Sequence, residues 1–301
     1  MPLRRRFIAA VSSAAFAFLS RPSMALSNDA AAGLLLARLV RQGFGLAAMQ
    51  VDGQHVDIVA RGETRAGESL REDALSEVGS ITKTFTALLL ADAVLRKVLT
   101  LDGAVEEALP GAKLRDAAGE PIRWVDLATQ RSGLPRLPDN MAPKDAADPY
   151  ADYDEERLLS FLHGFEASVQ RATRWEYSNL GFGLLGHALA QAQRTSYAEL
   201  LDRRVLQPLG MKRTALAMPG QIIVGLADGH DAARNVVPQW HFGVLMDAGA
   251  LVMPASDLGR YAQPSAASSR RCRKRSHSVC AGTPPGRTSA TQWAWRGCER
   301  R

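Results

Sequence analysis

The stretch Ser80–Val98 constrains the fold of this 301-residue chain more than any other segment. Apolar residues recur along it at helical spacing, and beyond the first turn they occupy both opposite stripes of the helix that this spacing predicts. A helix that is apolar on nearly all sides is buried in a core. We therefore expect a globular domain built around this helix, with Lys83 inside the core and not on a solvated face.

Ser80 and Lys83 give the start of this helix a chemical signature. Residues three apart lie one helical turn apart, so the hydroxyl and the amine can meet. Burial lowers the pKa of a lysine and lets it act as a base near neutral pH. Free N–H groups at the helix start favour developing negative charge. These are the requirements of a serine nucleophile with a lysine base; the alternative is that Ser80 is an N-cap and Lys83 a surface residue.

The chain body indicates an α+β architecture, with two strands followed mostly by helices. The segments Phe44–Val51 and Val56–Arg61 are predicted as short strands flanking Asp52-Gly53, a hairpin turn signal. Helical spacing predicts further helices, and a stretch rich in Pro, Asp and Asn predicts a loop. The helices are Ser27–Gly43, Ile122–Gln130, Asp154–Gly164, Leu180–Ala190, Tyr197–Val205 (ending before Pro208) and one that starts at Ala255–Ala262; the loop is Pro135–Pro149.

The two ends of the chain differ from the body in charge. Residues 1–25 hold four Arg, a short apolar run and small residues before Ala25, which predicts a signal peptide cut after Ala25. The apolar run is too short to span a bilayer, so we expect no stable membrane anchor after cleavage. Residues 26–263 carry 24 basic and 30 acidic side chains, and this acidic body gives no reason to expect a nucleic-acid partner.

A second motif, Tyr177-Ser178-Asn179, stands just before the predicted helix Leu180–Ala190. A Tyr-x-Asn set on a turn places a phenol beside a carboxamide. Such a phenol can relay a proton, and the amide can orient an amide-bearing substrate. The alternative is that Asn179 caps the next helix and Tyr177 packs in the core.

The sequence lacks the motifs that several other catalytic mechanisms and binding sites require. There is no Gly-x-Ser-x-Gly, no P-loop and no His-Glu-x-x-His. The six His show no metal-ligand spacing. The three Cys, an odd number confined to the last 38 residues, fit no disulfide scaffold. We therefore predict no metal and no cofactor.

Taken together, the motifs resemble the serine β-lactamase and penicillin-binding protein superfamily, whose signature is Ser-x-x-Lys. The Tyr-Ser-Asn form is similar to the class C branch, its related esterases and D-aminopeptidases. The resemblance extends over roughly residues 30–263. The segments that carry it are Glu77–Ala87, Leu127–Pro135, Gln207–Met211 followed by Thr214, and Asp247–Leu258.

The resemblance implies a β-lactamase/DD-peptidase-like fold, in which helices flank an antiparallel sheet and a mainly helical subdomain is added. It implies that Ser80 is acylated by a β-lactam or a D-Ala-type amide or ester, and that Lys83 and Tyr177 share general-base work. Asn179 would hold the substrate's side-chain amide, and the Ser80 N–H would form half of an oxyanion hole. Together with the predicted export signal, we expect a periplasmic or secreted monomer that acts on small molecules.

The sequence departs from the family pattern in three places. Gln130-Arg131 stands where His-Thr is usual, and Arg171-Ala172-Thr173 stands where a Pro-Gly turn is usual. No Lys-Thr-Gly or His-x-Gly motif is found on a late strand. Residues 264–301 carry nine basic side chains against one acid, with no visible period. We interpret this tail as out of frame or disordered, so that the hydrolase domain, 26–263, lacks its C-terminal strands; the alternative is a functional basic arm.

Two hypotheses about function follow. The first is an exported serine hydrolase that works through an acyl-enzyme as a class C-type β-lactamase, a penicillin-binding activity connected with antibiotic resistance. On the same fold, a D-Ala-D-Ala carboxypeptidase or an esterase remains an alternative. The second is a catalytically dead truncated product, because the third motif is missing.

Overall fold

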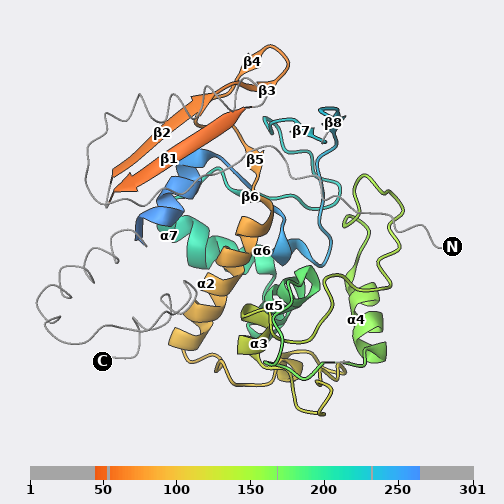
Figure 1. Cartoon of the computed structure of the whole chain (residues 1–301). Coiled ribbons are helices and arrows are strands. Elements are labelled where there is room, and N and C mark those ends of the chain that lie inside the picture. Colours follow the sequence, from red (N-terminus) through yellow and green to blue (C-terminus); the bar gives the residue numbers. More distant parts are fainter. Residues whose placement is uncertain (1–44, 53–54, 168, 232, 265–301) are drawn as a thin grey trace, which may run out of the picture.

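The computed structural model describes residues 45–52, 55–167, 169–231 and 233–264. The predicted signal peptide, the predicted helix Ser27–Gly43 and all but the first residue of the basic tail lie outside the described residues. The described part combines helices with short antiparallel sheets, as Figure 1 shows. The predicted α+β class is confirmed.

The first two strands form an antiparallel hairpin. Strand β1 (Leu46–Asp52) pairs with β2 (His55–Arg61) along their whole length, in a register that sets Leu46 opposite Arg61. Both predicted strands are present, and their bounds differ from the expected ones by no more than two residues. In Figure 1 the hairpin lies at the top of the molecule, on the side away from α3, α4 and α5.

A small three-stranded sheet connects distant parts of the chain. Its order is β5 (Ser76–Glu77), β9 (Leu251–Met253) and β6 (Ala215–Leu216), all antiparallel neighbours. It fixes the segment just before Ser80 against the segment after Asp247. The remaining described strands pair as β3 (Glu63–Arg65) with β4 (Glu68–Ser69) and β7 (Gly229–His230) with β8 (Val236–Val237).

The helix predicted over Ser80–Val98 is divided in the structure. A 3₁₀ turn, η1 (Gly79–Ile81), leads into the α-helix α2 (Thr82–Leu95). One face of α2 is buried in the core, including Phe85, Leu89, Leu90 and Ala93. The expectation of burial on nearly all sides was wrong, because Leu88 is 41% exposed and Leu95 is 68% exposed. Among the described residues, other helices pack against one side of α2, and apolar side chains on its other side reach the surface.

The remaining helices follow the predicted order with changed bounds. Helix α3 is shorter than expected, α4 begins one residue late after the N-cap Asp154, and α5 extends two residues beyond Ala190. A further helix covers 255–264. The bounds are η2 (Val105–Ala108), α3 (Trp124–Ala128), α4 (Glu155–Gly164), α5 (Asn179–Ala192), α6 (Tyr197–Leu201), η3 (Asp202–Leu206), α7 (Gln207–Leu209) and η4 (Met246–Ala248).

The helical segment that starts at Tyr197 continues past the predicted stop. It passes through a π-helical turn, η3, and ends only after Leu209, so the expectation that it ends before Pro208 was wrong. Pro208 lies in the first turn of α7, where the missing N–H of proline is tolerated. The true end is Gly210, whose φ of 65° places it in the left-handed region that glycine adopts without strain.

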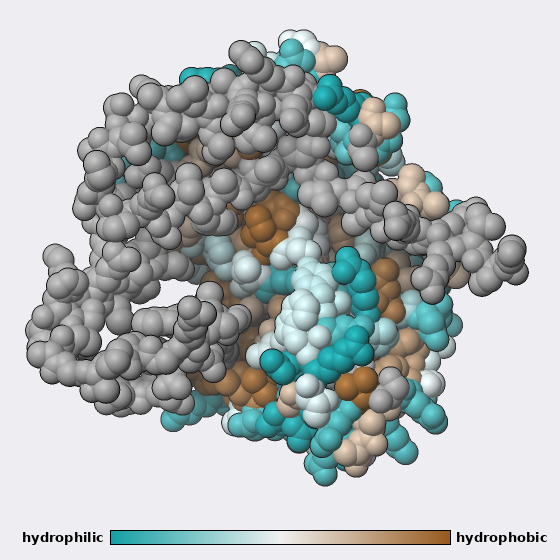
Figure 2. All heavy atoms as spheres, in the orientation of Figure 1, coloured by the Kyte–Doolittle hydropathy of each residue, from teal (hydrophilic) through white to brown (hydrophobic). Residues whose placement is uncertain are grey.

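Helix α5 occupies the middle of the core, and it packs against α2, α3 and η4. Two of its glycines permit a close approach of η4. A Cβ on Gly183 would lie 2.5 Å from Leu245 Cδ2, and a Cβ on Gly186 would overlap the side chain of Asp247. This approach matters for the site, because η4 supplies a carbonyl group to it. On the outer face, Figure 2 shows apolar residues as separate patches among polar ones.

The close packing of α5 on η4 gives a test of the fold. Gly183→Ala should lower the free energy of unfolding by about 1–3 kcal/mol, because the added methyl group overpacks a tight contact. Gly164→Ala is the matched control, since a Cβ at Gly164 meets open space. Urea unfolding of both variants and the parent measures the effect. Equal midpoints for Gly183→Ala and Gly164→Ala would contradict the described packing.

Candidate active site

Ser80 is exposed at the surface in the turn η1, which is separated from the end of β5 by one residue. The hydroxyl of Thr82 holds this turn: it donates to the Gly79 carbonyl at 2.7 Å and accepts the Leu251 N–H at 3.1 Å. Because Leu251 begins β9, the turn is fastened to the small sheet. The 3₁₀ turn still brings the Ser80 hydroxyl to 3.2 Å from the Lys83 amine.

Lys83 is buried, and its amine has three oxygen acceptors. Besides Ser80 Oγ, these are Asn179 Oδ1 at 2.9 Å and the Ala248 carbonyl at 2.7 Å. The acceptors come from η1, the start of α5 and the end of η4. Burial lowers the pKa of Lys83 to about 7, with a further contribution from the positive charge of Arg136. Near neutral pH the amine is therefore divided between its charged and neutral forms.

Tyr177 closes the other side of Ser80. Its hydroxyl lies 2.6 Å from Ser80 Oγ, as the donor. The Lys83 amine lies 4.9 Å from the centre of the Tyr177 ring, and the Arg136 guanidinium carbon lies 5.4 Å from it. Two cations thus stand near one phenol ring. Ser80 Oγ is in hydrogen-bond contact with a phenol and an amine at the same time.

The turn that carries Tyr177 is held through Ser178. The Ser178 N–H donates to Gln130 Oε1 at 2.7 Å, and the Ser178 hydroxyl donates to the Pro135 carbonyl at 2.6 Å. Ser178 Oγ also accepts the Gly181 N–H at 2.7 Å, so Ser178 is the N-cap of α5. The interpretation of Asn179 as the cap was wrong, which leaves its side chain available to the site.

Asn179 is the first residue of α5, and its amide is engaged at both ends. Its oxygen accepts from Lys83, and its nitrogen donates to the Tyr150 hydroxyl at 3.1 Å. The backbone N–H of Asn179 donates to the Arg136 carbonyl at 3.0 Å. Asn179 therefore contacts the predicted loop Pro135–Pro149 near its start, at Arg136, and the residue that directly follows the loop, Tyr150.

The structure brings together the four side chains singled out from the sequence, Ser80, Lys83, Tyr177 and Asn179. Sequence reasoning missed Arg136 and Tyr150. Arg136 directly follows the Ser-Gly-Leu-Pro segment, and this place in the sequence could have indicated that it lies near the site. Tyr150 lies at the end of a loop without periodicity, and nothing in the sequence marks it.

Gln130 was noted in the sequence only as a departure from the family pattern. In the structure it is buried, and it supports the Tyr177 turn twice. Its side chain accepts the Ser178 N–H, and its carbonyl accepts the Glu176 N–H at 2.9 Å. The glutamine therefore connects the two motif segments with neutral hydrogen bonds.

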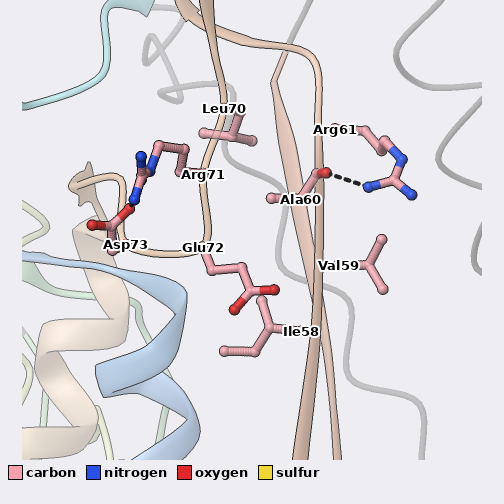
Figure 3. Close-up of a pocket in the computed structure, with 8 residues that line it drawn as sticks. All are labelled: Ile58, Val59, Ala60, Arg61, Leu70, Arg71, Glu72 and Asp73. Carbon is pink, nitrogen blue, oxygen red and sulfur yellow. Dashed lines mark hydrogen bonds and ion pairs between the residues drawn. The ribbon is translucent and has the colours of Figure 1, made fainter.

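A cavity of about 730 Å³ lies elsewhere, between β2 and residues 70–73 (Figure 3). Ile58 and Glu72 point into the space between the strand and the loop, whereas Arg61 points away. The charge of Asp73 is already paired with Arg71 at 3.1 Å and with Arg213 at 2.9 Å. None of the four side chains around Ser80 described above lines this cavity.

Two features are absent from the part of the chain that the structure describes. No three side chains of His, Cys, Asp or Glu gather there as metal ligands. None of the helices there combines the length and the hydropathy needed to cross a membrane.

Comparison with known proteins identifies the family of this chain. The sequence profile of the Beta-lactamase family matches residues 30–296. The chain is 32% identical over 174 residues to the D-alanyl-D-alanine-carboxypeptidase/endopeptidase AmpH of Escherichia coli, a match covering 56% of this chain and 44% of AmpH. It is 27% identical over 201 residues to a beta-lactamase of Pseudomonas fluorescens, covering 65% of this chain and 52% of that protein.

Solved structures with a similar fold include proteins of the same kind as these sequence relatives. The crystal structure of a class C beta lactamase from Rhodobacter sphaeroides superposes with a TM-score of 0.64 at 27% identity, covering 78% of this chain and 64% of that chain. The chain spans about half the length of the curated relatives it matches. It belongs to the Beta-lactamase family, within the superfamily of serine β-lactamases and penicillin-binding proteins.

Proposed function

We propose that this chain is an exported serine hydrolase that cleaves β-lactams through an acyl-enzyme, in the manner of a class C-type β-lactamase. The observation that carries the proposal is the position of Ser80 Oγ, which lies 2.6 Å from the Tyr177 hydroxyl and 3.2 Å from the Lys83 amine. A nucleophile within hydrogen-bond reach of a base is the arrangement that nucleophilic catalysis needs. Export is inferred from the signal-like residues 1–25.

The first chemical step is acylation. Ser80 Oγ attacks the carbonyl carbon of the β-lactam, and its proton passes to the Lys83–Tyr177 pair. The Ser80 backbone N–H stabilises the negative charge that develops on the carbonyl oxygen. Tyr177 then gives a proton to the leaving nitrogen as the carbon–nitrogen bond breaks, which leaves an ester on Ser80.

The second step is hydrolysis of this ester. A water molecule gives a proton to the same pair as its oxygen attacks the ester carbon. The intermediate collapses, the bond to Ser80 Oγ breaks, and the oxygen recovers its proton. The products are the opened β-lactam acid and free enzyme. Throughout, Asn179 holds the side-chain amide of the substrate.

A second candidate is D-Ala-D-Ala carboxypeptidase activity, which uses the same acyl-enzyme with a peptide as the acyl donor. The similarity to AmpH favours it, because that protein is named as a carboxypeptidase and endopeptidase. Fluorescent penicillin labelling followed by nitrocefin turnover separates the two. We expect labelling with turnover. Labelling without turnover would assign the carboxypeptidase, and the absence of both would contradict the proposed function.

Ser80→Ala should abolish covalent labelling by fluorescent penicillin, because alanine has no hydroxyl to attack the β-lactam carbonyl. The matched control is Ser160→Ala, on the exposed side of α4, which should label like the parent protein. Gel fluorescence and intact mass measure the adduct. Undiminished labelling of Ser80→Ala would overturn the assignment of the nucleophile.

The pH dependence of acylation should follow Lys83. Its pKa of about 7 means that the neutral, basic form is lost as the pH falls, so kcat/KM should decrease about tenfold per pH unit well below 7. Arg136→Gln removes the positive charge that helps to lower this pKa, so the acid limb should move to higher pH.

Arg174→Gln is the control for this shift, because Arg174 is also an exposed cation near Tyr177 in sequence but does not act on Lys83. Its acid limb should stay where the parent has it. If both variants or neither of them moved the limb, a group other than Lys83 would be the base.

Tyr177→Phe removes one hydroxyl and keeps the ring, so the unfolding midpoint should change little. Nitrocefin turnover should fall by roughly 10²–10⁴, the range for loss of a general acid–base group. Stopped-flow absorbance and thermal unfolding on the same sample measure both quantities. Turnover equal to that of the parent would return Tyr177 to a packing role.

A further inference from the structure

The orientation of the Asn179 amide follows from its two partners. The Lys83 amine donates to the amide oxygen at 2.9 Å. The amide nitrogen therefore faces Tyr150, and it donates to the Tyr150 hydroxyl oxygen at 3.1 Å. A carboxamide has two N–H bonds. One of them is used on Tyr150, and the other is left for a ligand.

Tyr150 is itself held firmly. It is only 7% exposed, and its ring stacks on Phe242 with centroids 4.8 Å apart and planes 22° apart. The ring of Trp240 lies 5.6 Å away. The Tyr150 carbonyl accepts the Gly243 N–H at 3.0 Å. Burial raises the pKa of Tyr150, so its hydroxyl stays neutral at physiological pH.

The stacked ring and the backbone bond fix the position of the hydroxyl oxygen. Without such contacts, the terminal torsion of an Asn side chain has no sharp energy minima, so the amide plane adopts a broad range of orientations. Lys83 holds only the oxygen end of the amide. The plane of the amide, and with it the direction of the second N–H, depends on the contact with Tyr150.

We propose that Tyr150 is a positioning residue of the active site, whose hydroxyl orients the Asn179 amide toward the side-chain carbonyl of an acylamino substrate. The inference rests on the proposed function, which assigns that carbonyl to Asn179. It predicts a preference for acyl donors that carry an amide beside the reacting carbonyl. Simple esters without that amide do not use the contact.

The test compares two substrates on Tyr150→Phe, which keeps the ring stack and removes only the acceptor. Nitrocefin carries an acylamino side chain, and p-nitrophenyl acetate carries none. The ratio of kcat/KM for nitrocefin to that for p-nitrophenyl acetate should fall about tenfold, as expected for the loss of one oriented hydrogen bond. The loss should appear mainly in KM.

Tyr153→Phe is the matched control. Tyr153 is another buried tyrosine at the same end of the loop, and its hydroxyl donates to Asn140 Oδ1 at 3.0 Å, away from Asn179. Its ratio should stay within twofold of the parent value. An equal loss on both substrates in Tyr150→Phe, or an equal change of ratio in Tyr153→Phe, would overturn the proposal.

A double-mutant cycle separates this inference from the proposed function. In the Asn179→Ala background, Tyr150→Phe should cause no further loss of the substrate ratio. The thermal unfolding midpoints of the same four proteins should also be non-additive, whether or not any substrate is hydrolysed. Additive midpoints overturn the positioning role. Non-additive midpoints without labelling or turnover by the parent protein overturn the proposed function alone.

Discussion

The buried amine of Lys83 is the group on which the arrangement of the site depends. Moving an ammonium group out of water is costly unless acceptors surround it. Three oxygens do so here, from Ser80, Asn179 and Ala248. Each belongs to a different segment of the chain, so satisfying one amine requires that α2, α5 and η4 meet at one point. The glycines of α5 that face η4 make this meeting sterically possible.

The same burial gives the amine its chemistry. A lysine on the surface is fully protonated near neutral pH and cannot act as a base, whereas the pKa of Lys83 is lowered to about 7. Fold stability and proposed reactivity are therefore opposed at this residue. Acceptors that compensate for burial favour the charged form, and the surrounding core together with Arg136 favours the neutral one.

Around Lys83, a layer of neutral hydrogen bonds supports the reactive groups. Gln130 and Ser178 connect the Ser-Gly-Leu-Pro loop to the Tyr177 turn, and Tyr150 holds the amide of Asn179. Gln130 has a φ of 61°, an uncommon conformation for a residue other than glycine. Such positions persist only where the surroundings fix them, and here two hydrogen bonds from the Tyr177 turn do so.

The sequence by itself determined what depends on neighbours within one or two turns. The three-residue spacing of Ser80 and Lys83 sets them on one turn, and the turn signal Asp52-Gly53 between two short strands predicts the β1–β2 hairpin. The sequence could not predict the exposure of Leu88 or the continuation of a helix through Pro208, because both depend on what packs against the helix. The contacts of Lys83 with Asn179 and Ala248, and of Asn179 with Tyr150, were decided only by the tertiary structure. They join segments that lie tens of residues or more apart, and only long-range packing brings such segments together.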